Sequence, residues 1–147
     1  MAVTTAMCTS FKKEVLEALH DFNSAGNTFK IALIKSSEAG TYGAASTNYS
    51  NITGNSDEAS GTGYSAGGNT LTNVDPTNDS TVGITDFNDT SWTTVTVTTS
   101  GCMIYNSTNS NRAVSVHSFG GTQTVTAGTL TLVFPAAAAA TAIIRIS

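Results

Sequence analysis

The chain has 147 residues and a net charge of −4, and only 11% of its residues are charged, against about 25% in typical globular proteins. Nucleic-acid binding is disfavoured, because a phosphate backbone must be neutralised by several cations and no Lys or Arg lies between Lys35 and Arg112. No apolar run reaches the ~18 residues that would span a bilayer, so we expect no membrane partner. The 26 threonines instead predict an all-β protein with hydroxyl-rich faces, a kind of surface that often packs against other protein or further copies of itself.

The first residues, MAVTTAMCTSFKKEV, lack a basic stretch followed by an apolar one, so we expect no secretory signal. Cys8 and Cys102 are the only cysteines. Two isolated cysteines in an unsecreted chain are more often buried thiols, although their spacing does not exclude a disulfide.

The stretch 9–22, TSFKKEVLEALHDF, predicts an amphipathic helix. Thr9 or Ser10 can cap its start, and NSAGN (23–27) ends it. Five apolar residues fall on one helical face, which we expect to lie across a sheet: Phe11, Val15, Leu16, Leu19 and Phe22.

A predicted strand at 28–35, TFKIALIK, precedes the long polar stretch 36–60. Tyr42, Tyr49 and Ile52 are the only sizeable apolar residues of that stretch. Long loops in compact domains are usually functional or bound by a partner, so these three residues are candidate interface residues.

The block SGTGYSAGGNTL contains Gly61, Gly63, Gly67 and Gly68. A phosphate-binding loop would need a Lys followed by Ser or Thr and the start of a helix, whereas a threonine-rich strand follows here. The four glycines therefore predict a structural turn.

The remaining apolar segments predict short strands separated by turns every eight to twelve residues, the spacing of a sandwich or barrel. We expect a bulge near Thr93 and Thr94, where the alternation of SWTTVTVTT is interrupted, and a turn at Gly120 and Gly121. The expected strands are 69–74 (ended by Asp75-Pro76), 81–87, 91–99, 102–105, 113–119, 122–127, 129–134 and 142–146. The sequence thus predicts one mainly β domain over 1–147, an antiparallel β-sandwich of about eight short strands with one N-terminal amphipathic helix.

Residues that could carry chemistry lack the required patterns. His20 and His117 show no metal-binding spacing, and no motif around either cysteine supports a Cys–His nucleophilic pair. Near the end of the expected helix, a charged His20 would be favourable for structural reasons alone.

Two further groups have both a structural and a functional interpretation. The aspartates of DPTNDSTVGITDFND (75–89) suit tight turns better than a calcium site. Trp92 is more often a core anchor than a stacking platform for a sugar, a role that Tyr42, Tyr49 or Tyr64 could share. We assign no catalytic, cofactor-binding or metal-binding residue.

The order of the blocks VLEALHDF, TFKIALIK, SGTGYSAGGNTL, MIYNST, FPA and AIIRI resembles a group of tailed-bacteriophage virion structural proteins. The resemblance covers nearly the whole chain except 36–57 and 136–140, and the group has no catalytic residues to transfer. It implies a capsid decoration (cement) protein that binds the major capsid protein on the virion surface and assembles in the host cytoplasm. Segment 36–60 and the chain ends would then supply contacts. The alternatives are a tail or head–tail joining component and a carbohydrate-binding adhesion module.

Overall fold

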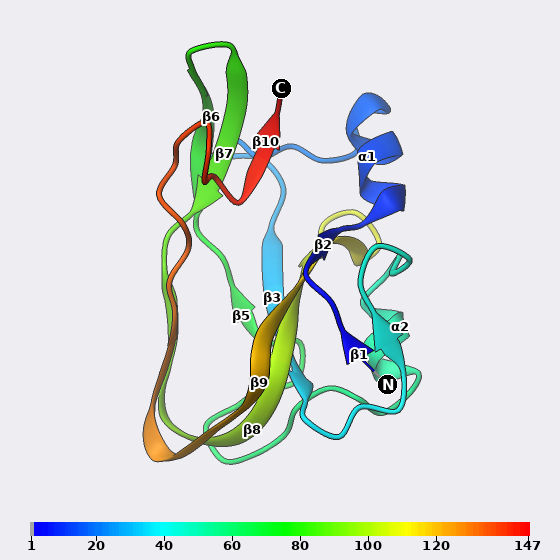
Figure 1. The fold of residues 1–147 in the computed structure, drawn as a ribbon, viewed down its shortest axis with the longest axis vertical. Coiled ribbons are helices and arrows are strands. Elements are labelled where there is room, and N and C mark those ends of the chain that lie inside the picture. The colour runs from blue at the N-terminus through cyan, green and yellow to red at the C-terminus, as the bar shows by residue number, and fades with distance from the viewer. Residues whose placement is uncertain (1) are drawn as a thin grey trace.

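The computed structural model describes residues 2–147 and is mainly β (Figure 1). The strands are β1 (Ala2–Val3), β2 (Ala6–Met7), β3 (Phe29–Lys35), β4 (Thr41–Tyr42), β5 (Asn69–Thr70), β6 (Asn73–Asp79), β7 (Val82–Phe87), β8 (Thr90–Asn106), β9 (Arg112–Leu132) and β10 (Ile144–Ile146). The helices are α1 (Thr9–Leu16) and α2 (Ser50–Thr53).

The main sheet is antiparallel and has the order β2-β9-β8-β3-β5. A smaller antiparallel sheet has the order β10-β7-β6, and β1 pairs with β4 in parallel. Strand β3 lies inside the main sheet between β8 and β5, which is why Ile31–Ile34 are buried on both faces.

The hairpin of β8 and β9 gives the molecule its second layer. Register shifts between Trp92 and Val97, with Thr94 at φ 52° and Ala127 at φ 47°, bend both strands. Beyond the bend, the first residues of β8 and the last of β9 run back toward the small sheet (Figure 1). The predicted mainly β, sandwich-like architecture and the bulge near Thr93 and Thr94 are confirmed.

The expected strands at 113–119, 122–127 and 129–134 form one strand, β9, with 91–99 and 102–105 joined in β8. The predicted turn at Gly120 and Gly121 is wrong. These glycines belong to an irregularity within β9, where Ser118 and Gln123 pair with Gly101 and Thr99. Extra residues on one strand bend a ladder without ending it.

The expected strand 69–74 is wrong as one strand, because the structure divides it between β5 in the main sheet and β6 in the small sheet; β6 then passes through Pro76 to Asp79. Because β6 is the edge strand of the small sheet and its register shifts between Val74 and Thr77, the missing N–H of Pro76 leaves no ladder bond unmade.

Helix α1 is shorter than the predicted 9–22. Ala18 adopts a left-handed conformation (φ 56°), its N–H donates to the Val15 carbonyl (3.1 Å), and the Leu19 N–H donates to the Glu14 carbonyl (3.0 Å). This pair of bonds is a Schellman motif, which terminates a helix. The shortened helix leaves Leu16 89% exposed, whereas Phe22 reaches the core from the following turn.

The glycine-rich turn approaches the backbone of the main sheet closely. A Cβ on Gly68 would lie 1.8 Å from the Ile31 carbonyl oxygen, and one on Gly61 would lie 1.8 Å from that of Thr96. Gly63, Gly67 and Gly68 also have positive φ angles of 79°, 90° and 69°. What these glycines approach is therefore the chain's own strands β3 and β8.

Candidate functional site

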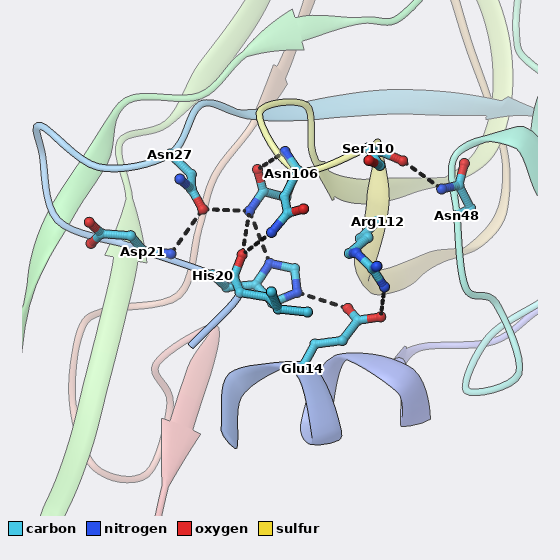
Figure 2. Close-up of polar contacts among 10 residues, drawn as sticks. Glu14, His20, Asp21, Asn27, Asn48, Asn106, Ser110 and Arg112 are labelled. Carbon is cyan, nitrogen blue, oxygen red and sulfur yellow. Dashed lines mark hydrogen bonds and ion pairs between the residues drawn. The ribbon is translucent and has the colours of Figure 1, made fainter. Parts of the chain in front are cut away.

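A largely buried polar cluster joins Glu14 of α1, His20, Asn106 of β8 and the partly exposed Arg112 of β9; we call it the Glu14 cluster (Figure 2). One carboxylate oxygen of Glu14 accepts from Arg112 (2.8 Å), and the other lies 2.9 Å from Nε2 of His20. On the far side of the ring, Nδ1 of His20 is 3.1 Å from Nδ2 of Asn106.

The hydrogen bonds of the cluster define the state of His20. Because Nδ2 of Asn106 is a donor, Nδ1 of His20 accepts and Nε2–H donates to Glu14. Burial lowers the pKa of His20 and outweighs the raising effect of Glu14, so the ring is neutral, although a helix end would favour a charged ring.

A carboxylate–imidazole pair is the arrangement of a general base, but here the second ring nitrogen faces an amide instead of a nucleophile or open space. Asn106 also donates to Asn27 (2.8 Å) and accepts from the Asn109 N–H (3.1 Å). The cluster therefore ties α1 and the following loop to the β8–β9 turn.

The two thiols are buried and free, so the disulfide that the sequence left open is absent. Burial, with a smaller effect of Glu14, raises the pKa of Cys8 to about 11, and burial raises that of Cys102 to about 12. Neither thiol provides a thiolate near neutral pH. Burial lowers the pKa of His117, which contacts the Ser115 hydroxyl (2.9 Å).

The aspartates of 75–89 hold loops together. Within residues 2–147, no group of three or more His, Cys, Asp and Glu side chains converges as a metal would require. Each of these aspartates accepts a bond from a backbone N–H: Asp75 from Ser24 (2.5 Å), Asp79 from Ala139 (2.7 Å), Asp86 from Phe87 (2.8 Å) and Asp89 from Phe134 (2.8 Å).

The prediction that Tyr42 and Ile52 are interface residues is wrong. Their side chains are only 1% and 0% exposed and belong to the chain's own core. The Tyr42 hydroxyl donates to the fully buried Asp57 (2.5 Å), which also pairs with Lys35 (3.0 Å). Burial alone would raise the pKa of Asp57. Bonds from Tyr42, from two backbone N–H groups and from Lys35 outweigh that effect and hold the pKa well below its usual range.

A second carboxylate, that of Glu58, binds two further tyrosines near this stretch. It accepts from the hydroxyls of Tyr49 and Tyr64, the latter at 2.8 Å. The Tyr49 ring is stacked on Tyr105 with centroids 4.5 Å apart. Stretch 36–60 is therefore folded into the body, and of the three candidate interface residues only Tyr49 is partly exposed.

Trp92 is 4% exposed and lies beside Tyr64, with ring centroids 5.9 Å apart. This burial agrees with a core anchor, whereas a sugar platform requires an open ring face.

One local signal for the Glu14 cluster was present in the helix pattern and was not used. Glu14 lies three residues after Phe11 and beside Val15, on the apolar face of the helix, where a carboxylate must find partners. Nothing in the sequence identified the partners of Asn106 or Asp57. Asn106 contacts His20, which is 86 residues away, and Asp57 binds Tyr42 within a stretch that has no apolar periodicity.

The β8–β9 ribbon, defined as residues 90–99 and 122–132, is a long surface without charged side chains of its own. Between Asp89 and Arg145 the only charged residue is Arg112. Exposed threonines line both strands. The hydroxyl oxygens of the paired residues Thr98 and Thr124 lie 3.3 Å apart.

In comparisons with protein-family models, with curated proteins and with solved structures, no match to this chain was found. No helix within residues 2–147 is long and apolar enough to cross a membrane.

Proposed function

We propose that this chain is a non-enzymatic structural protein of a tailed-phage virion, a decoration protein that binds the outside of the major capsid protein lattice. The observation that carries the proposal is the β8–β9 ribbon, a long exposed face of threonines without a charged side chain. The order of sequence blocks resembling phage structural proteins supports the same conclusion.

The ribbon suits contact with protein for a physical reason. Burying hydroxyl groups that find new partners costs far less than burying ammonium or carboxylate groups, and a surface without charge does not repel neighbouring copies. A stable contact of this kind needs about 1,200–2,000 Å². Many copies, each with a modest contact, would then oppose the internal pressure of a capsid.

The candidate reactive groups support a structural role as well. His20 is held in the Glu14 cluster, both thiols are buried, and the carboxylates of Asp57 and Glu58 bind the chain's own tyrosines. The polar groups of 36–60 are likewise used to build the body rather than a contact surface. The proposed contact therefore lies on the ribbon rather than on 36–60.

Immunogold labelling of virions with an antibody to this chain tests the location. Gold spread over the head is the expected result. Gold at the neck or tail would replace decoration with joining or adhesion, and unlabelled intact particles would overturn a surface role.

Co-sedimentation with particles that lack the protein tests the surface. The double variant Thr98→Lys/Thr124→Lys places two cations on the ribbon and is expected to abolish binding. Thr53→Lys, on the exposed end of α2, is the matched control and should bind like the unmodified protein. Equal binding of the double variant and the control would overturn the ribbon as the capsid-binding face.

A further inference from the structure

The last part of β9 has a free edge on the side away from β8. We define the β9 edge as residues 128–134, which are the end of β9 and the two residues that follow it. Strand β9 pairs with β8 along one side, and on its other side β2 reaches only Ser115 and Val116. Within residues 2–147, no strand or isolated bridge pairs with the outer side of the β9 edge.

The backbone hydrogen-bonding groups of Thr131 point away from β8. Its ladder partner is Ser91, whose carbonyl accepts from the Asn69 side chain of β5 (3.0 Å). The Ser91 and Thr131 hydroxyl oxygens lie 2.8 Å apart, which fits the narrow kind of antiparallel pair that exchanges no ladder bonds. The N–H and C=O of Thr131, and by alternation those of Thr129, therefore face outward from the ribbon.

The outer strands of the sheets avoid edge-to-edge pairing by means that the β9 edge lacks. Natural edges are kept short, or they carry charges, proline or a bulge. Strands β1, β2, β4 and β5 are each two residues long, and β10 contains Arg145. Strand β6 contains two aspartates, Pro76 and a register shift. The β9 edge, GTLTLVF, has no charge and no proline, and it leaves Val133 73% exposed.

We propose that the β9 edge pairs with the β9 edge of a second copy of this chain, antiparallel and about a two-fold axis at Thr131. Thr131 then exchanges both ladder bonds with its own counterpart. Thr129 of each copy lies opposite Val133 of the other, so β-branched side chains pair across the contact and cover the exposed valine. The second layers of the two copies join into one continuous sheet.

Two features favour a second copy over a strand of another protein. In a two-fold pairing the residues at the axis meet their own counterparts, so a charge there would face a like charge. No charged residue lies between Arg112 and Arg145. The free segment is also limited symmetrically, because Ala127 (left-handed, φ 47°) and Pro135 (no N–H to donate) each lie four residues from Thr131. A contact with another protein requires neither feature.

Sedimentation equilibrium of the purified full chain measures the association. The concentration range should extend to about 1 mM, because one pair of short strands buries less than a standard interface. We expect a monomer–dimer equilibrium. Thr131→Pro removes the outward N–H and should abolish the dimer, whereas Thr131→Val keeps that N–H, lacks only the hydroxyl and should dimerise like the unmodified protein. A monomer at every concentration, or equal dissociation constants for the two variants, would overturn the proposal.

A charge exchange between two chains tests the two-fold axis and does not depend on the proline variant. Thr131→Lys should raise the dissociation constant about tenfold, because two ammonium groups meet at the axis, and mixing it with Thr131→Glu should restore the dimer. The control is the same exchange at Thr129, which lies opposite Val133 instead of its own counterpart, so mixing should have little effect there. Equal benefits of mixing at both positions, or none at Thr131, would overturn the arrangement.

The pairing does not rest on the proposed function. It uses main-chain groups at the edge of the ribbon, whereas the proposed capsid contact uses the threonine face. Circular dichroism melting of each variant confirms that the fold is kept. Because no capsid is present in these measurements, their failure would overturn the strand pairing alone, and failure of the co-sedimentation test would overturn the capsid contact alone.

Discussion

At the scale of single residues, the contrast between Glu14 and Glu17 shows what a carboxylate on α1 does when it is buried. The Glu14 side chain is 7% exposed and is held between Arg112 and His20, whereas Glu17 is 43% exposed and pairs with Lys13 across one helical turn (3.1 Å). The contacts of Glu14 connect segments that are distant in the chain, whereas the Glu17–Lys13 ion pair joins two residues on the exposed surface of one helix.

Glu14→Gln is therefore expected to lower the free energy of unfolding by about 2 kcal/mol, because Arg112 loses its counter-charge and one buried donor loses its acceptor. Glu17→Gln should change it by less than about 0.5 kcal/mol, since exposed pairs contribute little. Urea unfolding at neutral pH measures both. Similar values for the two variants would mean that the Glu14 cluster adds nothing beyond a surface ion pair.

At the scale of elements, the glycine-rich turn is fixed by contact as much as by conformation. Gly68 and Gly120 have nearly the same positive φ (69° and 74°), but a Cβ on Gly68 meets the Ile31 carbonyl at 1.8 Å and one on Gly120 meets nothing within 4 Å. The two positions thus separate the cost of conformation from the cost of a clash.

We expect Gly120→Ala to cost about 1 kcal/mol, the penalty for a left-handed non-glycine residue. Gly68→Ala should cost more than about 3 kcal/mol, because strands β3 and β5 would have to move apart. Chemical denaturation of both variants measures the difference. A Gly68→Ala protein as stable as Gly120→Ala would show that the turn is not pressed against β3.

The same elements show how much of the fold could be predicted. Alternation of apolar residues located most strands and the interruption near Thr93 and Thr94, because these are local patterns. The ends of strands were predicted wrongly where pairing with a distant strand determines how far the strand extends. Gly120 and Gly121 suggested a turn, yet pairing of both flanks with β8 carries β9 through them, and Pro76 did not stop an edge strand. The helix ended early at an alanine, which carries none of the usual stop signals.

For the candidate sites as well, features set by local sequence were predicted and features set by tertiary contacts were not. The glycine turn and the buried thiols follow from local composition and were anticipated. The position of Tyr42 depends on Asp57, a buried carboxylate that the sequence pattern did not place beside it, and Ile52 is held by the Asp57 N–H. A polar stretch can thus belong to the core when its few charges each bind several partners.

At the scale of the whole molecule, the two histidines and Asp57 separate the acid sensitivity of the fold into two pH ranges. Burial lowers the folded-state pKa of both His20 and His117 below the ordinary value of 6.5. The unfolded chain therefore binds more protons than the folded chain once the pH falls below about 6.5. Asp57 has a depressed pKa, so its contribution is present above 3.8 and is lost as the pH falls further.

The expected outcome is a free energy of unfolding that is level above about pH 7 and falls between pH 6.5 and 5, by at most about 1.4 kcal/mol per pH unit for each histidine. A second decline, from Asp57, should begin only below about pH 4. Urea unfolding at intervals from pH 8 to 3 measures the profile. His117→Gln, which keeps a polar group beside Ser115, should reduce the first decline and leave the second unchanged. A level profile down to pH 5 would contradict the neutral state of both rings and with it the hydrogen-bond assignment of the Glu14 cluster.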